Sequence, residues 1–367
     1  MKVNFPPHNP NDKEKDMIPN RCSSIAAIGL AVFLVIALTV GPATAAEKVR
    51  WKGQSCFGIG SPLGQHTIVL WKKYVEEMSG GRMELTLHDA GEIVPPSKVY
   101  DAVKDGLLDF GLNTPGYQKG KYPAGDLFYT LPGGIFEVND LLLWLYAGGG
   151  KELEQEMYGD ELIVFPLGLT PPEQIWSKKE IKTLEDIKGL KIRAAGLSMD
   201  MWEKMGASVV LLTGGEVLPA LQRGMIDATE FLEPSYDYTM GLHEVCKYRF
   251  GPPIHMTNNI FQLIIKTKSW KALPDDLKAI VENAAMAATL QGYADFWQSS
   301  IEFNKKIEEY GTITSKLPKE EQLKARKIAF EILNEKSEKY PYFKKVWESQ
   351  NAFIEPDKPY SDLTKFD

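Results

Sequence analysis

The sequence predicts an α/β fold made of two similar lobes with a cleft between them. The main observation is an internal repeat: Ala102-Val-Lys-Asp-Gly-Leu-Leu-Asp109 returns as Ala220-Leu-Gln-Arg-Gly-Met-Ile-Asp227, with the shared pattern A-x-x-x-G-x-x-D. Each copy is typical of the end of an amphipathic helix, a glycine that stops it, and a short apolar strand. Helix followed by strand is half of a βαβ unit. A chain of 367 residues also exceeds a comfortable single core, which favours two domains.

The first lobe is predicted to alternate strands and helices up to the first copy of the repeat. Strands are indicated where apolar and polar side chains alternate, and Ser61 followed by Pro62 is a favourable helix start. The predicted elements are, in order, a strand at 49–55, a helix from Ser61 that ends at Gly80-Gly81, a strand at 83–87, and a helix that Pro95-Pro96 opens.

The second lobe is predicted to repeat this order. Its elements are a strand at 191–194, a helix at 198–205, a strand at 209–212, and a helix at 216–223 that runs into the second copy. Between the lobes, residues 138–159 are predicted to be helical, with a break at the three glycines 148–150. A later apolar run at 261–265 is predicted to be a strand that could cross back to the first lobe.

The C-terminal part is predicted to be helical. From Pro274 to Tyr310 the chain has no further proline and carries long apolar stripes. A helix of this length cannot be covered by one small lobe, so it should either span both lobes or pack against a second subunit. The last ~60 residues are predicted to form further helices and a Pro-rich polar tail.

The N-terminal 45 residues have the composition of a signal peptide. Lys13, Lys15 and Arg21 precede an uncharged apolar run, and Ala43-Thr-Ala45 offers small residues for cleavage. The run is shorter than the ~20 apolar residues of a typical membrane-spanning helix. We therefore expect cleavage near Ala45 and export to the periplasm.

Charge and cysteine usage narrow the class of protein further. The formal net charge is −7 with both signs mixed along the chain, which argues against a nucleic-acid partner. Cys56 and Cys246 fall in different predicted regions, so we expect two buried thiols rather than a disulfide.

No catalytic or organic-cofactor motif is complete in this chain. The run from Gly58 to Gly64 is one residue too long for a dinucleotide fingerprint, and Lys151 after three glycines is followed by Glu152 instead of Ser or Thr. Neither G-x-S-x-G nor H-E-x-x-H occurs, and the five histidines lack metal-ligand spacing. We therefore expect a protein that is not an enzyme and has no organic cofactor.

Two charged residues are the strongest candidates for binding. Arg193 lies in a predicted strand that is otherwise mostly apolar, and its guanidinium matches a carboxylate with paired donors. Glu230 follows the second copy of the repeat, where the first copy has Leu112. Open α/β sheets bind ligands near the carboxyl ends of their strands. The alternatives are a solvent-exposed arginine and a structural ion pair, and spacing alone does not decide between them.

Several longer segments resemble the solute-binding proteins of TRAP transporters. The likeness covers most of the chain from residue 47 to about 290. It is carried by Met78-Ser-Gly-Gly-Arg82, Ala90-Gly-Glu-Ile-Val94, the segment from Tyr100 to Asp109, Leu184-Glu-Asp-Ile-Lys-Gly-Leu-Lys-Ile-Arg193, and the segment from Gly215 to Glu230. The resemblance implies a two-lobe periplasmic binding protein fold with a central cleft, a hinge and long C-terminal helices. It also implies a receptor that captures a small organic acid and delivers it to a membrane permease.

The resemblance also implies roles for particular residues. Arg193 would pair with the carboxylate of the ligand, and Tyr117 with Asn258 or Asn259 would line the cleft. Glu230 and Phe231 match the branch that binds 2-oxo acids, in which a glutamate, the next carbonyl and a glutamine hold Na⁺ or Ca²⁺. Gln174, within Pro171-Pro-Glu-Gln-Ile-Trp176, is the nearest candidate for that glutamine. The same branch includes dimers joined through a long C-terminal helix.

We therefore expect a signal peptide at 1–45, a first lobe at 46–170 to which part of 260–310 returns, a second lobe at 171–259, and C-terminal helices with a possible dimer contact at 260–367. The expected function is that of a TRAP receptor for a 2-oxo acid or related monocarboxylate. The alternative within the same class is a cation-independent receptor for an amino acid, aromatic acid or sugar acid. Two alternative hypotheses assign the chain to other functional classes: a secreted enzyme, or a sensor subunit that docks on a membrane kinase.

Overall fold

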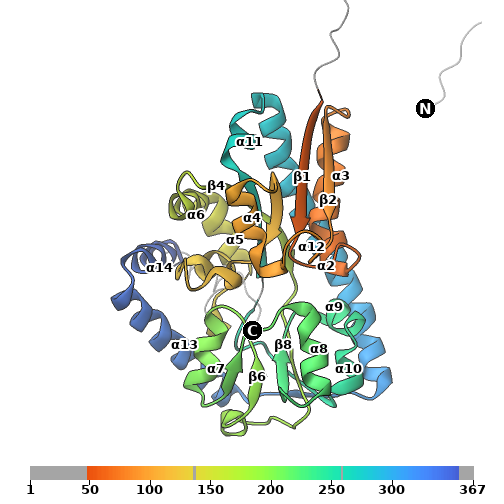
Figure 1. Cartoon of the computed structure of the whole chain (residues 1–367). Coiled ribbons are helices and arrows are strands. Elements are labelled where there is room, and N and C mark those ends of the chain that lie inside the picture. The colour runs from red at the N-terminus through yellow and green to blue at the C-terminus, as the bar shows by residue number, and fades with distance from the viewer. Residues whose placement is uncertain (1–47, 135–137, 258, 355–367) are drawn as a thin grey trace, which may run out of the picture. The chain divides into compact units, whose positions relative to one another are not determined.

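The computed structural model describes residues 48–134, 138–257 and 259–354, and these form a mixed α/β structure built on two sheets (Figure 1). We call the part built on the first sheet the first lobe and the part built on the second sheet the second lobe. The predicted α/β class with two lobes is confirmed. The proposed signal peptide and the polar tail lie outside the described residues.

The first sheet has five strands in the order β2-β1-β3-β10-β4. β1 pairs in parallel with both β2 and β3, whereas β10 pairs antiparallel with β3 and β4. The chain therefore returns to this sheet with β10, after it has formed β5 to β9 of the second sheet. The strands are β1 Val49–Ser55, β2 Met83–His88, β3 Phe110–Asn113, β4 Leu162–Thr170 and β10 Asn259–Lys266.

The second sheet has six strands in the order β7-β6-β8-β5-β9-β11. β6 pairs in parallel with β7 and β8, and β5 pairs antiparallel with β8 and β9. The outermost strand, β11, was not anticipated because it is a short segment between two long helices. The strands are β5 Ile175–Ser177, β6 Lys191–Arg193, β7 Ser208–Val210, β8 Ala228–Glu230, β9 Tyr248–Gly251 and β11 Ile313–Lys316.

The two sheets share one plan, as the repeat predicts. The parallel part β2-β1-β3 of the first sheet corresponds to β7-β6-β8 of the second, and in each an antiparallel pair follows. The repeated aspartates also have the same contacts. The Asp109 carboxylate accepts the Lys52 N–H at 2.9 Å, and the Asp227 carboxylate accepts the Lys191 N–H at 3.2 Å.

Helices flank both sheets, and most of those predicted are present within one to three residues at each end. The predicted break in 138–159 separates α5 from α6, with Gly149 at a φ of 85°. The helical elements are α2 Pro62–Gly64, η1 Gln65–Val69, α3 Leu70–Met78, η2 Pro96–Lys98, α4 Val99–Asp105, η3 Pro115–Gln118, η4 Gly125–Phe128, η5 Pro132–Gly134, α5 Val138–Ala147, α6 Gly150–Tyr158, η6 Leu184–Ile187, α7 Leu197–Lys204, α8 Gly214–Gln222, α9 Pro234–Thr239, α10 Leu242–Val245, α11 Thr267–Lys271, α12 Asp275–Tyr310, α13 Lys319–Lys339 and α14 Pro341–Ile354.

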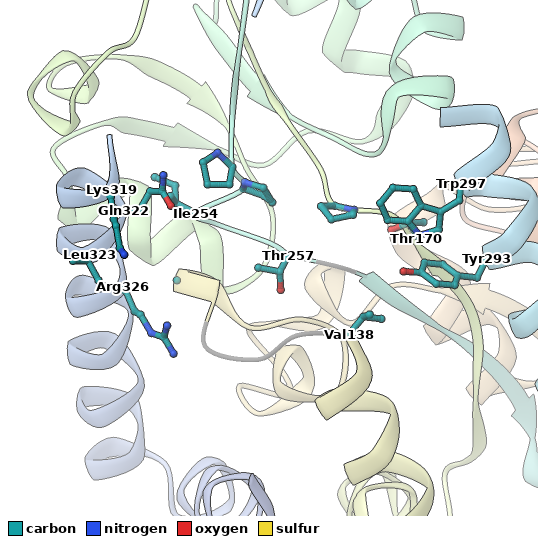
Figure 2. Close-up of a pocket in the computed structure, with 14 residues that line it drawn as sticks. Val138, Thr170, Ile254, Thr257, Tyr293, Trp297, Lys319, Gln322, Leu323 and Arg326 are labelled. Carbon is teal, nitrogen blue, oxygen red and sulfur yellow. The ribbon is translucent and has the colours of Figure 1, made fainter. Parts of the chain in front are cut away.

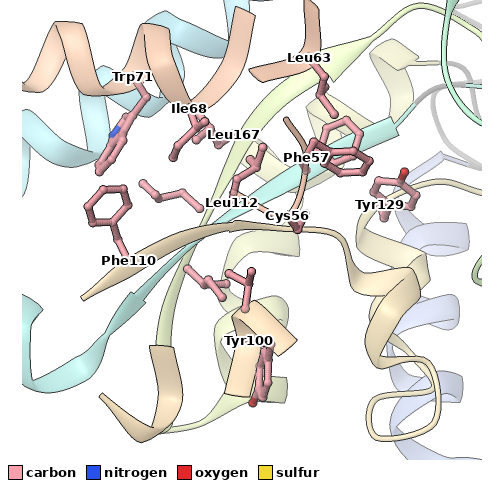
Figure 3. Packing of buried hydrophobic residues seen from close by; sticks show 14 of the residues in the cluster. Cys56, Phe57, Leu63, Ile68, Trp71, Tyr100, Phe110, Leu112, Tyr129 and Leu167 are labelled. Carbon is pink, nitrogen blue, oxygen red and sulfur yellow. The ribbon is translucent and has the colours of Figure 1, made fainter. Parts of the chain in front are cut away.

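The core of the first lobe is formed by apolar side chains of its sheet and of the helices against it. Trp71 of α3 lies beside Phe110 of β3, with ring centroids 5.1 Å apart (Figure 3). Phe57, which follows β1, packs edge-on against Phe261 of β10. Cys56 and Cys246 are buried free thiols, as predicted.

The long helix α12 packs against both lobes, which is the first of the two alternatives that its length allows. In the first lobe, Trp71 Nε1 donates to the Val281 carbonyl at 3.2 Å. In the second lobe, Ser300 Oγ donates to the Glu233 carboxylate at the start of α9, at 2.6 Å. One large apolar residue of this helix is covered by neither lobe, since Leu290 is 75% exposed. In the part of the chain that is described, no helix combines the length and apolarity that a membrane crossing requires.

Candidate functional site

The charged residues singled out in the sequence line a small cavity between the two lobes. Its walls come from segments that follow the strands of both sheets, and its volume of about 20 Å³ leaves room for about one water molecule. The lining residues are Phe57, Thr114, Tyr117, Tyr129, Glu173, Arg193, Ala195, Glu230, Phe231 and Met256. Four predicted site residues (Tyr117, Arg193, Glu230 and Phe231) are therefore brought together.

Arg193 ends strand β6 with its side chain buried at 5% exposure. Its Nε donates to the Leu212 carbonyl and its Nη1 to the Glu230 carbonyl, both at 2.9 Å. The guanidinium also lies over the Phe231 ring, 4.7 Å from its centroid. Among the described residues it makes no ion pair, and these hydrogen bonds leave Nη2 without an acceptor. A buried cation without a carboxylate partner is costly, so the site is suited to an anionic ligand.

Glu230 ends strand β8, and its carboxylate is held by the first turns of α7. Oε1 accepts the Ala195 N–H at 2.9 Å and the Ser198 hydroxyl, and Oε2 accepts the Trp202 indole N–H at 2.9 Å. The predicted alternative of an ion pair with Arg193 is not formed, because Arg193 contacts only the Glu230 main chain. Three donors around one buried carboxylate hold its position rigidly.

Glu173 is a second buried carboxylate in this pocket, and sequence reasoning missed it. Its side chain accepts a hydrogen bond from the Asn259 amide, and one oxygen lies 3.3 Å from His255 Nε2. The same ring nitrogen lies 3.7 Å from the Glu230 carboxylate. Burial raises the pKa of Glu173, and the charge of Glu230 adds to this, whereas His255 and Arg193 oppose it. The pocket thus combines one arginine with two carboxylates.

Aromatic rings form the remaining wall of the pocket. Phe57 of the first lobe packs edge-on against Phe231 and Tyr236 of the second lobe, with centroids 6.4 and 6.3 Å apart. Burial raises the pKa of Tyr117 above its usual range, so its phenol stays protonated at neutral pH. The wall therefore offers apolar faces together with a neutral hydroxyl group.

The structure does not bring Gln174 into the pocket. Its side-chain oxygen accepts a hydrogen bond from Arg249 Nη1 at 3.3 Å, and the neighbouring Glu173 lines the cavity instead. Successive residues of an extended segment point to opposite sides, so a shift of one residue exchanges the two side chains. Asn259 contacts the pocket through Glu173, and Asn258 lies outside the described residues.

The donors in the pocket fit a hard cation in their chemistry. Na⁺ and Ca²⁺ prefer oxygen ligands, and Glu173, Glu230 and the main chain at Phe231 supply oxygens only. Within the described ranges, no group of three or more His, Cys, Asp or Glu side chains is arranged to hold a metal ion. A cation here would therefore depend on main-chain or ligand oxygens as well as on the two carboxylates.

A larger cavity of about 540 Å³ lies elsewhere, between α12, α13 and the segments that join the lobes (Figure 2). Tyr293 and Trp297 of α12 face Leu323 and Arg326 of α13 across it. None of the predicted site residues that the structure describes lines this cavity. Its size alone therefore does not make it the ligand site.

A family model and a characterised relative both match this chain over most of its length. Residues 57–339 match the model of the bacterial extracellular solute-binding proteins, family 7 (DctP). The chain is 32% identical over 336 residues to a monocarboxylate 2-oxoacid-binding periplasmic protein of Nostoc sp. strain PCC 7120, covering 89% of this chain and 91% of that protein.

Solved structures of three TRAP solute-binding proteins are similar over 86% of this chain. The protein of Colwellia psychrerythraea, with bound calcium and pyruvate, has a TM-score of 0.81 at 29% identity over 97% of its chain. That of Pseudoalteromonas atlantica, with sodium and pyruvate, has a TM-score of 0.79 at 29% identity over 97%. That of Bordetella bronchiseptica, a dimer with calcium and picolinate, has a TM-score of 0.82 at 25% identity over 95%.

Proposed function

The chain belongs to the bacterial extracellular solute-binding proteins of family 7, and on that premise we propose that it is a periplasmic TRAP receptor for a small 2-oxo acid such as pyruvate. The ligand carboxylate pairs with Arg193 in the pocket between the lobes. The receptor performs no chemistry on the ligand and delivers it to the membrane permease of the transporter.

The observation that carries this proposal is the buried Arg193 without a carboxylate partner among the described residues. Its Nε and Nη1 are fixed by two carbonyl oxygens and its face by Phe231. The guanidinium is thus oriented before the ligand arrives, and little entropy is lost when a carboxylate binds Nη2.

A cation beside the ligand would balance the negative charge of this site. Two buried carboxylates and an anionic ligand would otherwise face a single arginine at short range. Glu230, the main-chain carbonyl of Phe231 and Glu173 are the residues that would hold Na⁺ or Ca²⁺, with Glu173 in the place predicted for Gln174. When bound, the ion supplies a positive charge that lowers the cost of binding the anion.

Calorimetric titration of pyruvate into the purified protein tests the arginine assignment. Removing a buried charged hydrogen-bond partner costs about 2–5 kcal/mol, so Arg193→Ala should weaken binding by at least ~30-fold. Arg223→Ala, which removes an exposed arginine at the end of α8, is the matched control and should bind like the wild type. Undiminished binding by Arg193→Ala would overturn the arginine assignment.

A cation-independent receptor for an amino acid, aromatic acid or sugar acid is the second candidate. The observation that favours it is His255 Nε2, which already lies close to both carboxylates. The two candidates differ in whether binding needs a cation. The shift in unfolding temperature caused by pyruvate is measured once with sodium or calcium present and once in a sodium-free buffer that contains a chelator. A ligand-induced shift that disappears without cations supports the first candidate, and an unchanged shift supports the second.

We further propose a homodimer through α12. Four large apolar side chains of this helix are exposed at helical spacing, and the Trp297 among them also lines the cavity of about 540 Å³. Large apolar side chains exposed along one face of a helix are typical of a protein–protein contact. The four residues are Met286, Leu290, Trp297 and Ile301, with exposures of 45, 75, 42 and 69%.

Light scattering after gel filtration tests the dimer. The wild-type protein should have twice the mass of one chain, and Leu290→Glu with Ile301→Glu should be monomeric because each places a charge in the contact. Lys305→Glu changes a charge at an exposed position of the same helix and should stay dimeric. A monomeric wild-type protein would exclude this contact.

A further inference from the structure

Apart from the pocket, the two lobes meet at a second contact that has unusual chemistry. One side is the segment after β3, with Gly116 and Asp126, and the other is Gly196, which precedes α7. A Cβ atom on Gly116 would lie 3.3 Å from the Gly196 nitrogen, so the two backbones approach closely. Gly196 has a φ of 65°, which glycine adopts without strain.

Asp126 is the unusual residue in this contact. It is 1% exposed, and neither carboxyl oxygen forms a side-chain hydrogen bond among the described residues; the Leu197 N–H at the start of α7 is the neighbouring main-chain donor. A Cβ atom on Gly196 would lie 2.7 Å from Asp126 Oδ1, so the carboxyl group lies against the N-terminus of α7. The positive end of the helix dipole favours an acidic group here, although burial disfavours its charge.

The groups around Asp126 come from several elements. Lys119 from the end of η3 pairs with Asp200 of α7 at 2.7 Å, and Lys336 of α13 pairs with the same carboxylate at 3.1 Å. The Tyr129 and Tyr158 phenols also lie near enough to interact with Asp126. Burial raises the pKa of Asp126 to about 7, and Asp200 adds to this, whereas Lys119, Lys336 and the Leu197 N–H oppose it.

The helix that Asp126 contacts is the one that holds Glu230. The Ala195 N–H, the Ser198 hydroxyl and the Trp202 indole all donate to the Glu230 carboxylate. The same few residues at the start of α7 therefore form the contact between the lobes on one side and support the binding pocket on the other. A change at Asp126 can reach the ligand through this helix.

We propose that Asp126 is a positioning residue for ligand capture: closure of the lobes seats its carboxyl group against the start of α7, and closure is accompanied by uptake of a proton at this group. The proposal rests on the proposed capture of a ligand in the pocket. We take the structure described, in which the lobes meet around a cavity of about 20 Å³, as the closed receptor. Opening would expose Asp126 to water, where a carboxyl group is ionised at neutral pH. In the closed receptor it is buried, and the neutral form is the one that burial favours.

The sign of the pH dependence follows from this difference. Because the closed state binds the proton more tightly, lowering the pH favours closure and raises ligand affinity. With a pKa of about 7 in the closed state and the ordinary 3.8 in the open state, affinity should fall about tenfold between pH 6 and pH 8. Above pH 8 the affinity should no longer change with pH, because Asp126 is ionised in both states. Below pH 6 the affinity should keep rising until the open state is protonated as well, near pH 3.8.

Calorimetric titration with pyruvate from pH 5.5 to 8.5 tests the proposal. The wild-type protein should lose affinity about tenfold between pH 6 and 8, and Asp126→Asn, which is neutral at every pH, should change by less than about twofold. Asp105→Asn, at an exposed position of the first lobe, should keep the wild-type slope. A flat wild-type profile, or an Asp126→Asn profile with the full slope, would overturn the proposal.

Small-angle X-ray scattering of the ligand-free protein provides a readout that does not depend on the ligand. The wild-type radius of gyration should be larger at pH 8 than at pH 6, and that of Asp126→Asn should be the same at both. Equal radii for the wild type at both pH values would overturn the proposal even if Asp126→Asn fails to fold. If pyruvate does not bind at any pH, the proposed ligand is wrong, and the scattering result alone decides on Asp126.

Discussion

At equivalent positions of the two sheets, the second lobe has charged residues where the first lobe has uncharged ones. In the shared plan of the two sheets, Gln54 of β1 corresponds to Arg193 of β6, and Leu112 of β3 corresponds to Glu230 of β8. Gln54 bonds the main chain of Ile93 and Val94 and so has a structural role. The charges of Arg193 and Glu230 therefore come from the second lobe, that of Glu173 comes from the segment between β4 and β5, and the first lobe contributes mainly aromatic and hydroxyl groups.

Replacing Glu230 by Gln should lower the free energy of unfolding by about 1–3 kcal/mol. The carboxylate accepts from three N–H or O–H donors, whereas an amide would turn its own N–H₂ toward at least one of them. Urea unfolding followed by tryptophan fluorescence measures the loss. Glu244→Gln changes an exposed glutamate and should cost less than about 0.5 kcal/mol. Equal stabilities of the two variants would show that the three hydrogen bonds to Glu230 contribute no stability that depends on its negative charge.

At this scale the sequence located the second-lobe charges but not all of the pocket. Arg193 and Glu230 were found because a charge interrupts an apolar strand pattern at a defined point of the repeat. Glu173 and His255 lie in segments without periodicity, where no pattern shows which of two neighbouring side chains points inward. The choice of Gln174 over Glu173 differs by one residue, which in an extended chain reverses the direction of the side chain.

At the level of elements, the repeat A-x-x-x-G-x-x-D describes one way to join a helix to a strand. The alanine carbonyl accepts the N–H groups that follow the glycine, from Leu107 in the first lobe and from Met225 in the second. Gly106 and Gly224 close their helices with φ of 82° and 72°, and the aspartate then bonds the neighbouring strand. Each of the three residues shared by the two copies thus has a defined structural role at the junction of helix and strand.

Gly224→Ala should destabilise the protein by about 1–2 kcal/mol, because an L side chain is strained in the left-handed conformation. No atom lies within 4 Å of the added Cβ, so strain is the only cost. Gly215→Ala, in the first turn of α8 and also with open space around its Cβ, should stabilise by up to about 0.5–1 kcal/mol. Chemical denaturation compares the two, and the same sign for both would contradict this account.

The long helix α12 was predicted closely, and the short strands that were missed are those outside the order shared by the two lobes. α12 was expected from Pro274 to Tyr310 and runs over Asp275–Tyr310, because many turns with one apolar pattern leave little ambiguity. The strands β5, β9 and β11 have three or four residues each and are formed by their neighbours in the sheet. β6 and β7 are as short, but the order of elements in the first lobe indicated where to expect them, whereas β5, β9 and β11 had no such guide.

At the scale of the whole molecule, α12 couples the two lobes. It packs on α3 and β4 of the first lobe and on α9 of the second, so neither lobe can lose its structure without exposing part of this helix. We therefore expect the described part of the chain to unfold in a single cooperative transition. The packing of α12 on the first lobe is tight at Gly292, where a Cβ atom would lie 1.9 Å from the His66 carbonyl oxygen.

Gly292→Ala should accordingly lower the stability of both lobes together, by about 1–3 kcal/mol, because the clash is with main chain that cannot rotate away. Differential scanning calorimetry should show one peak that moves to lower temperature as a whole. Gln291→Ala, one residue earlier at an exposed position, should change the free energy of unfolding by less than about 0.5 kcal/mol. Its peak should therefore stay close to that of the wild type. Two separate peaks, of which only one moves, would mean that the lobes fold independently and that α12 does not couple them.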